Sequence, residues 1–216
     1  MKVTVLNQHN SVINQFLKEL RDTKLQKDSM RFRKNIARIS SVMAYEISKT
    51  LQFQTEQVTT PLGIAEVNTI SDSLVITTIL RAGLPMQEGF MEFFDKAECG
   101  FISAFRKYTD EEHFTIETEY LAAPDLNGKT VVIADTMLAT GNSMVTAYHA
   151  LLRNGQPKRV ILASVLGTKK AIDYVEKEIG DNAELWIAAI DPELNEHSYI
   201  VPGLGDAGDL AFGDKL

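Results

Sequence analysis

The chain has 216 residues, of which 44% are hydrophobic, and its 22 basic and 29 acidic side chains give a formal net charge of −7. This length predicts one domain whose core needs no disulfide, and a single cysteine excludes both an internal disulfide and a cysteine-based zinc cluster. The acidic balance argues against nucleic acid as a partner, because nucleic-acid surfaces depend on many Lys and Arg side chains. With no secretion signal and no apolar run of about 18 residues, the sequence predicts a cytoplasmic protein that does not contact membranes.

The first 71 residues predict two helices and a hairpin. Ser11 precedes apolar residues at helical spacing, and a second apolar stripe runs from Asp28 or Ser29 to Ile47. Between residues 57 and 68 the apolar residues flank Pro61-Leu62-Gly63, which is typical of a hairpin turn. We expect residues 1–71 to form an N-terminal cap.

Residues 18–38 carry eight basic and three acidic side chains, so they are locally positive. The pattern favours a solvated helix face or a set of ion-pair partners. The alternative is a surface that binds an anion or RNA.

After Asp72 the pattern changes to short apolar strands that alternate with helical stretches. This alternation predicts an α/β fold with a mostly parallel sheet flanked by helices, in which ligands bind at the carboxyl ends of the strands. We expect a single domain over residues 1–216 with its core at 72–216. Cys99 lies in an apolar run, which favours a buried structural thiol. The expected strands are 74–80, 100–105, 130–134, 159–165 and 185–190, and the expected helices are 83–94, 143–153 and 169–179.

A polar stretch at about 107–127 contains alternating apolar residues. It is predicted to form a flexible hairpin flap over the ligand crevice, and the alternative is an inert surface excursion.

The strongest motif is the segment 135–143, here called the phosphate loop. An apolar strand ends on Asp135, and a run of small and hydroxylic residues then leads into a helix. The free N–H groups of the helix start, together with Thr140 and Ser143, predict a site for a phosphate monoester. Asp135 is expected to face hydroxyl groups or a metal-bearing part of the same ligand, so the motif indicates a sugar phosphate. The alternative is an ordinary capped helix.

Two further strand ends carry arginines, Arg81 and Arg106. Because they lie at neighbouring strand ends beside a phosphate loop, these arginines are predicted to bind a polyphosphate; the alternative is that they form surface ion pairs.

The segment 195–209 is rich in glycine and contains G-x-G-x-x-G at 203–208. We reject a dinucleotide fingerprint, because that motif needs a second strand and an acidic residue about 20 residues further on. Exposed main-chain groups in such a loop are suited to reading the edge of a planar heterocycle, and the alternative is a tight C-terminal turn. His197 is expected to position this loop rather than act as a base.

Together these segments resemble the uracil phosphoribosyltransferase family over nearly the whole chain. The resemblance rests on MRFR at 30–33, ILRAG at 79–83, DTMLATGNS at 135–143 and YIVPGLGDAGD at 199–209. It implies a type I phosphoribosyltransferase fold with N-terminal helices and a C-terminal base-binding loop. Two departures stand out: Thr136 replaces the family's usual proline, and Asn142 replaces a glycine.

The resemblance also implies roles for particular residues. Uracil is expected against Ile200, Gly205, Asp206 and Ala207, and the catalytic residues are expected to be Asp206, Arg106 and Asp135. Mg²⁺ is expected through the pyrophosphate rather than through protein ligands, and a homodimer or higher oligomer is expected. Whether GTP activates the enzyme is left open. The expected contacts of 5-phosphoribosyl 1-pyrophosphate are Arg81, Arg106, Asp135, Thr136, Met137, Leu138, Ala139, Thr140, Gly141, Asn142, Ser143 and Asp206.

The expected reaction transfers ribose 5-phosphate to N1 of uracil and yields UMP and pyrophosphate. The alternative is a non-catalytic regulator on the same fold that senses uridine nucleotides and binds RNA. A purine or orotate enzyme of the same superfamily is disfavoured by the C-terminal segment.

Overall fold

The computed structural model describes residues 1–108 and 114–215, with the side chains of 104–119 outside that description. In these residues a seven-stranded sheet has the order β1-β9-β8-β7-β4-β5-β6, and every neighbouring pair is parallel except β5 with β6. The predicted α/β class with a mostly parallel sheet is confirmed. The strands are β1 (Lys2–Val5), β4 (Leu74–Leu80), β5 (Glu98–Tyr108), β6 (Phe114–Ala122), β7 (Thr130–Leu138), β8 (Arg159–Thr168) and β9 (Glu184–Asp191).

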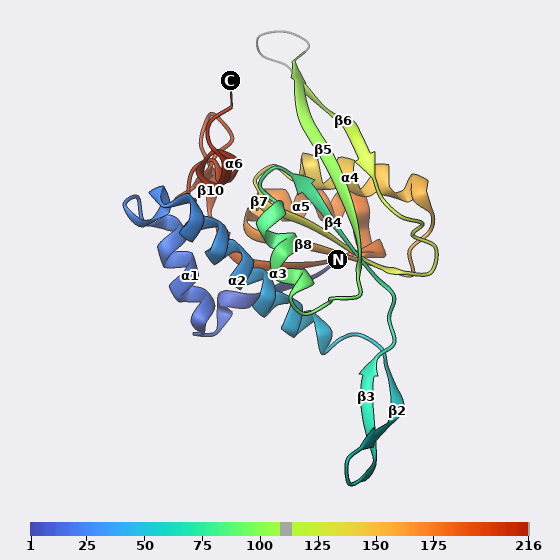
Figure 1. The fold of residues 1–216 in the computed structure, drawn as a ribbon. Helices are drawn as coiled ribbons and strands as arrows, with labels where there is room; N and C mark the ends of the chain where they lie inside the picture. The colour runs from blue at the N-terminus through green and yellow to red at the C-terminus, as the bar shows by residue number, and fades with distance from the viewer. Residues whose placement is uncertain (109–113, 216) are drawn as a thin grey trace.

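Helices cover both faces of the sheet (Figure 1). One apolar cluster joins α1 (Val12–Arg21), α2 (Ser29–Ser48) and α3 (Leu84–Met91) to one face, and a second joins α4 (Asn142–Leu151) and α5 (Lys169–Ile179) to the other. β7 shows why, because Val132 and Ala134 enter the first cluster while Val131 and Ile133 enter the second. No helix in residues 1–108 and 114–215 is long and apolar enough to span a membrane.

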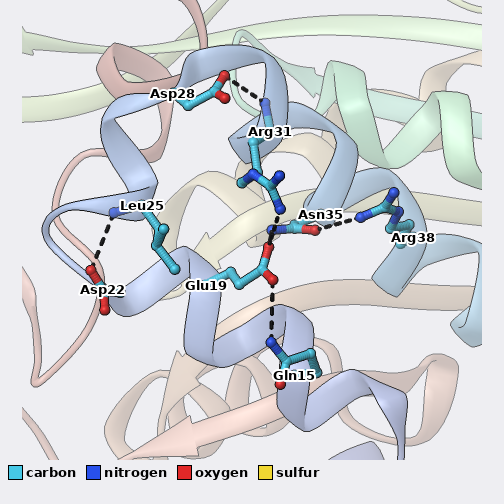
Figure 2. Close-up of polar contacts among 8 residues, drawn as sticks. All are labelled: Gln15, Glu19, Asp22, Leu25, Asp28, Arg31, Asn35 and Arg38. Atoms are coloured by element: carbon cyan, nitrogen blue, oxygen red, sulfur yellow. Dashed lines mark hydrogen bonds and ion pairs between the residues drawn. The ribbon is translucent and has the colours of Figure 1, made fainter.

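A polar network joins α1 to α2 (Figure 2). The Glu19 carboxylate accepts hydrogen bonds from Asn35 at 2.8 Å, Arg31 at 3.1 Å and Gln15 at 3.2 Å. These contacts, led by the one from Asn35, lower the pKa of Glu19 to about 2. Glu19 therefore holds α1 against α2 as a charged group.

Both predicted helix starts in this region are confirmed. Ser11 caps α1 by accepting from the N–H of Ile13, and Asp28 caps α2 by accepting from the N–H of Arg31. The region also contains β1, which the sequence analysis did not predict and which pairs in parallel with β9. Residues 2–5 therefore belong to the main sheet.

The predicted hairpin around Pro61 is formed by β2 (Phe53–Thr60) and β3 (Gly63–Ile70). It projects from the body of the molecule (Figure 1), and all eight residues of β2 are exposed. Leu62 at its turn is 99% exposed.

The stretch predicted to form a flap includes an antiparallel pair, in which β6 follows β5 in the register Tyr108 opposite Phe114. Part of the 107–127 prediction falls on residues 109–113, outside the described residues. The antiparallel strand pair is present, and its closure as a flap stays a prediction.

The predicted buried thiol at Cys99 is wrong, because Cys99 is exposed. Burial along β5 begins only at Gly100, one residue later, and the Cys99 sulfur lies 3.7 Å from the sulfur of Met91. The apolar residues next to Cys99 in the sequence therefore did not indicate that the first two residues of β5 are exposed.

The other strands and helices predicted within residues 74–190 are all present, and most differ from the predictions only in their bounds. β4 and α5 have the predicted bounds, whereas β7 continues four residues beyond the predicted end and α3 ends three residues earlier. The C-terminal segment holds a two-stranded ladder of β10 (Glu193–Leu194) and β11 (Ile200–Val201), followed by α6 (Ala207–Phe212). Short 3₁₀ helices lie at Leu6–Gln8, Leu25–Lys27, Leu152–Asn154 and Gly180–Asn182.

Candidate active site

A pocket of about 230 Å³ opens at the carboxyl edge of β4 and β7. Three segments that are far apart in the sequence line it: 79–82, 135–144 without Asn142, and 198–208 in part. Most of the residues predicted to form the ligand site therefore meet at one place. The predicted residues that line it are Arg81, Asp135, Thr136, Met137, Leu138, Ala139, Thr140, Gly141, Ser143, Ile200, Gly205, Asp206 and Ala207.

Two predicted residues stand apart from this set. Asn142 is the first residue of α4 and is not among the lining residues. Arg106 lies in β5 opposite Ile116, and its side chain falls outside the described part of the chain.

The phosphate loop is fixed by contacts close to it in the fold. Gly141 has φ +86°, and a Cβ there would lie 3.0 Å from atoms of Tyr174 and Val175, so only glycine fits without a shift. The hydroxyl of Thr168, at the end of β8, donates to the carbonyl of Ala139 at 2.9 Å. The first turn of α4 therefore starts at the pocket, with its free N–H groups available to an anion.

Asp135 lies within β7 rather than after it, paired with Ser164 of β8. Burial raises its pKa to about 7, against the opposing effect of main-chain hydrogen bonds from Met137 and Thr136. A carboxyl group with this pKa exchanges its proton near neutrality, and once ionised it accepts hydrogen bonds from ligand hydroxyls.

Thr136 contributes no second carboxylate to the pocket. Its side chain is buried, and its hydroxyl has no hydrogen-bond partner among the described atoms. Asp135 is therefore the carboxylate that the end of β7 presents to the pocket.

Arg81 links the end of β4 to the C-terminal segment. Its guanidinium donates to the Asp209 carboxylate at 2.8 Å and to the carbonyl of Gly213 at 3.1 Å. Both ionic side chains are about one-third exposed, and Arg81 lines the pocket. Arg81 is therefore held in a fixed position where a polyanion can reach it.

Residues 199–209, here called the base loop, form the opposite wall. The sequence analysis treated this segment as a loop, whereas its last residues form the start of α6 at Ala207. Asp206 caps this helix, and its Oδ1 accepts from the N–H groups of Gly208 at 2.8 Å and Asp209 at 3.0 Å. The cap orients the main chain at Gly205, Asp206 and Ala207 toward the pocket.

His197 lies outside the pocket and is exposed. Its own N–H and that of Tyr199 donate to the side chain of Asn195, so Asn195 shapes the turn that leads to the base loop. The sequence analysis did not name the lining residues Ile79, Leu80, Ala82, Met144, Ser198, Tyr199, Gly208 and Lys215. Tyr199 and Ala82 lie inside motifs already noted, whereas Lys215 carried no sequence signal.

The basic region 18–38 is used largely for internal contacts. Arg31 pairs with Glu19, Lys34 with Glu88 and Arg21 with Asp191. Arg33 donates to the carbonyl of Ala211 at 2.6 Å. These contacts favour the ion-pair interpretation over an RNA surface.

Comparisons with known proteins agree with this geometry. The family model described as "Uracil phosphoribosyltransferase" matches residues 6–214. A Porphyromonas gingivalis protein named uracil phosphoribosyltransferase is 53% identical over 216 residues, covering 100% of both chains. A protein of the same name from Methanothermobacter thermautotrophicus is 41% identical over 188 residues, covering 86% of this chain and 85% of its own.

Solved structures share the fold. The AQ2163 protein from Aquifex aeolicus superposes with a TM-score of 0.87 at 28% identity, covering 98% of each chain. A hypoxanthine phosphoribosyltransferase from Staphylococcus aureus has a TM-score of 0.50 at 15% identity, covering 87% of this chain and 84% of its own. At that identity the second likeness concerns the fold alone.

Proposed function

This chain belongs to the uracil phosphoribosyltransferase family of pyrimidine salvage, and we propose how its pocket joins ribose 5-phosphate to N1 of uracil. In this reaction the bond between C1 of the ribose and pyrophosphate breaks, a bond from C1 to N1 forms, and N1 loses its proton. The products are UMP and pyrophosphate. The observation that carries the proposal is that the phosphate loop and the base loop line one pocket.

The donor, 5-phosphoribosyl 1-pyrophosphate, lies along the phosphate loop. Its 5-phosphate accepts hydrogen bonds from the main chain of Ala139–Ser143 at the start of α4. Ionised Asp135 accepts from the ribose hydroxyls. The glycine that the family carries at position 142 is replaced here by asparagine, which begins α4 and has no positive φ, so the loop does not need a glycine there.

Arg81 and Arg106 hold the pyrophosphate, so that charge is neutralised where the leaving group develops it. Among the residues that the structure describes, no three acidic, His or Cys side chains form a metal cluster. We propose that Mg²⁺ is held mainly by oxygen atoms of the donor's phosphates and by water, which are ligands that Mg²⁺ prefers. When bound, Mg²⁺ supplies further charge neutralisation on the pyrophosphate.

Uracil lies against the main chain of Ile200, Gly205, Asp206 and Ala207, whose donors and acceptors match the edge of a pyrimidine. The Asp206 carboxylate faces the reacting atoms. There it stabilises the positive charge that develops at C1 or assists removal of the N1 proton. Closure of the 107–127 flap excludes water, which otherwise hydrolyses the donor.

The protein functions as a homodimer or higher oligomer in the cytoplasm. The exposed hairpin β2–β3 supports assembly, because its side chains Val58, Leu62, Ile64 and Val67 are apolar and exposed. The regulator alternative has no support in the described residues, where Arg21, Arg31 and Arg33 make internal contacts.

The test is to incubate the protein with Mg²⁺, the donor and one base at a time, and to follow pyrophosphate. We expect release with uracil and little with orotate or hypoxanthine. No release with uracil, or faster release with either other base, would contradict the proposal. A salt-sensitive shift of RNA mobility would revive the regulator.

A further inference from the structure

The base loop is held in place by side chains from the N-terminal helices. Arg21, at the last turn of α1, donates to the carbonyl of Gly203 at 3.0 Å. The Gln26 amide donates to the carbonyl of Leu204 at 3.2 Å. In Figure 1, α1 and α6 lie on the same side of the molecule, and Gly203 and Leu204 come shortly before α6 in the chain.

Asp191 completes this brace from the end of β9. Its two carboxylate oxygens accept from the two terminal nitrogens of Arg21, each at 2.7 Å, and one of them also accepts from the N–H of Gly203 at 3.0 Å. Arg21 and Asp191 thus bind both the N–H and the carbonyl of the same glycine. Two polar groups of one residue fix its peptide planes as well as its position.

Gly203 is the point in the base loop where such a brace has most effect. It has φ +53°, and a Cβ would lie 2.0 Å from the carbonyl oxygen of Ile200, so the loop turns sharply here. Ile200 lies before the turn, and Gly205, Asp206 and Ala207 follow it. A displacement of Gly203 therefore changes the spacing between the two sides of the uracil site.

Because the Asp191 carboxylate is buried, it depends on its protein donors. The Asp191 side chain is only 6% exposed and that of Arg21 is 27% exposed. Removing the guanidinium leaves a buried carboxylate with one remaining donor, the N–H of Gly203, so the loop rearranges to bring in water or another donor. The helix that carries Arg21 is itself fixed by the Glu19 network (Figure 2).

We propose that Arg21 is a positioning residue for uracil, which acts through Asp191 to hold Gly203 at the turn of the base loop. This inference rests on the proposed function, because it assigns the base loop to uracil. The inference predicts different effects on the two substrates. Arg21 affects how uracil binds and does not affect the phosphate loop that binds the donor.

The experiment compares Arg21→Gln with a matched control, Arg159→Gln. Arg159 pairs with Glu184 at comparable exposures of 25% and 14%, and both begin their strands at the sheet edge opposite the pocket. For each variant the KM for uracil, the KM for the donor, kcat and the thermal midpoint are measured. Arg21→Lys serves as the conservative variant if Arg21→Gln does not fold.

We expect Arg21→Gln to raise the KM for uracil by at least about tenfold, equivalent to about 1.4 kcal/mol at 25 °C, with the donor KM within about twofold. Arg159→Gln should lower the thermal midpoint without moving either KM. Asp191→Asn combined with Arg21→Gln should raise the uracil KM by less than the product of the two single effects.

An unchanged uracil KM in Arg21→Gln, or in Arg21→Lys when only that variant folds, would overturn the inference. So would a parallel rise in both KM values, or a similar rise in uracil KM for Arg159→Gln. These results differ from a failure of the proposed function, in which the unsubstituted protein itself releases no pyrophosphate with uracil.

Discussion

The phosphate loop and the base loop face each other across one pocket, but they are stabilised in different ways. The phosphate loop is held by its own strand and helix and by the next βα unit, through Thr168 and the packing around Gly141. The base loop is held by Arg21 and Gln26, which lie more than 170 residues earlier in the sequence. The donor site is therefore stabilised by contacts between neighbouring elements, whereas the acceptor site depends on contacts between segments that are far apart in the sequence.

Asp206 gives the largest expected effect, because it serves the base loop as a helix cap and is proposed to serve the chemistry. Asp206→Ala removes both roles and should lose at least ~100-fold in kcat and ~1 kcal/mol of stability. Asp206→Asn keeps a capping oxygen, so its kcat should fall similarly at nearly unchanged stability. Pre-steady-state rates and urea unfolding measure the two. An asparagine variant with the normal rate would leave only the capping role.

Gly141→Ala tests the local character of the phosphate loop. The added Cβ meets Tyr174 and Val175 at a positive φ, so the loop shifts and kcat/KM for the donor should fall roughly 100-fold. Gly180→Ala is the control, since Gly180 also has a positive φ but no atom within 4 Å. It should cost about 1–3 kcal/mol of stability and leave kcat/KM unchanged. Equal losses of activity in the two variants would refute the local explanation.

The pH dependence of donor use should report Asp135. Its pKa is raised to about 7, so below that pH the carboxyl is protonated in the free protein and cannot accept from the ribose hydroxyls. We expect kcat/KM for the donor to fall about tenfold per pH unit below 7. The same raised pKa means that folding stability decreases as pH rises from about 4 through 7.

Asp135→Asn is the control for this profile. Its kcat/KM should be lower and should lack the step near pH 7. If the step persists in the asparagine variant, it belongs to another group or to the donor itself.

Glu19→Gln has the smallest expected effect on catalysis. The pKa of Glu19 is lowered to about 2 from 4.5, so its charged form stabilises the folded chain fully above about pH 4.5, and this is lost as pH falls through 2. The variant should unfold at lower urea concentration near neutrality, and the difference should shrink toward pH 2. Its kcat should be normal, and a constant difference over this pH range would contradict the assignment.

The parts of the fold that depend on neighbouring residues could be predicted from the sequence. Ser11 and Asp28 act as helix caps, and β4 and α5 have the bounds that their apolar patterns indicate. β1 was missed because four residues carry little periodicity and its partner β9 begins more than 180 positions later. Tertiary pairing, rather than local propensity, forms that strand.

The candidate site divides in the same way. The residues at strand ends were predicted because parallel strands deliver their carboxyl ends to one edge. The positions of Asp191 and Lys215 could not be predicted, since neither residue belongs to a motif and both positions depend on where distant segments meet. Cys99 failed for a related reason: its apolar neighbours say nothing about whether another element covers the start of β5.

The contact between Arg21 and Gly203 also sets an order of events during synthesis. At roughly 5–20 residues per second, the 182 residues that follow Arg21, up to and including Gly203, take roughly 9–36 s to be added. During that interval the guanidinium of Arg21 cannot bind Gly203, because the turn of the base loop has not yet been synthesised. β7, α4, β8 and α5 all precede Gly203 in the chain, so the segments of the donor half are synthesised before the turn that completes the acceptor half.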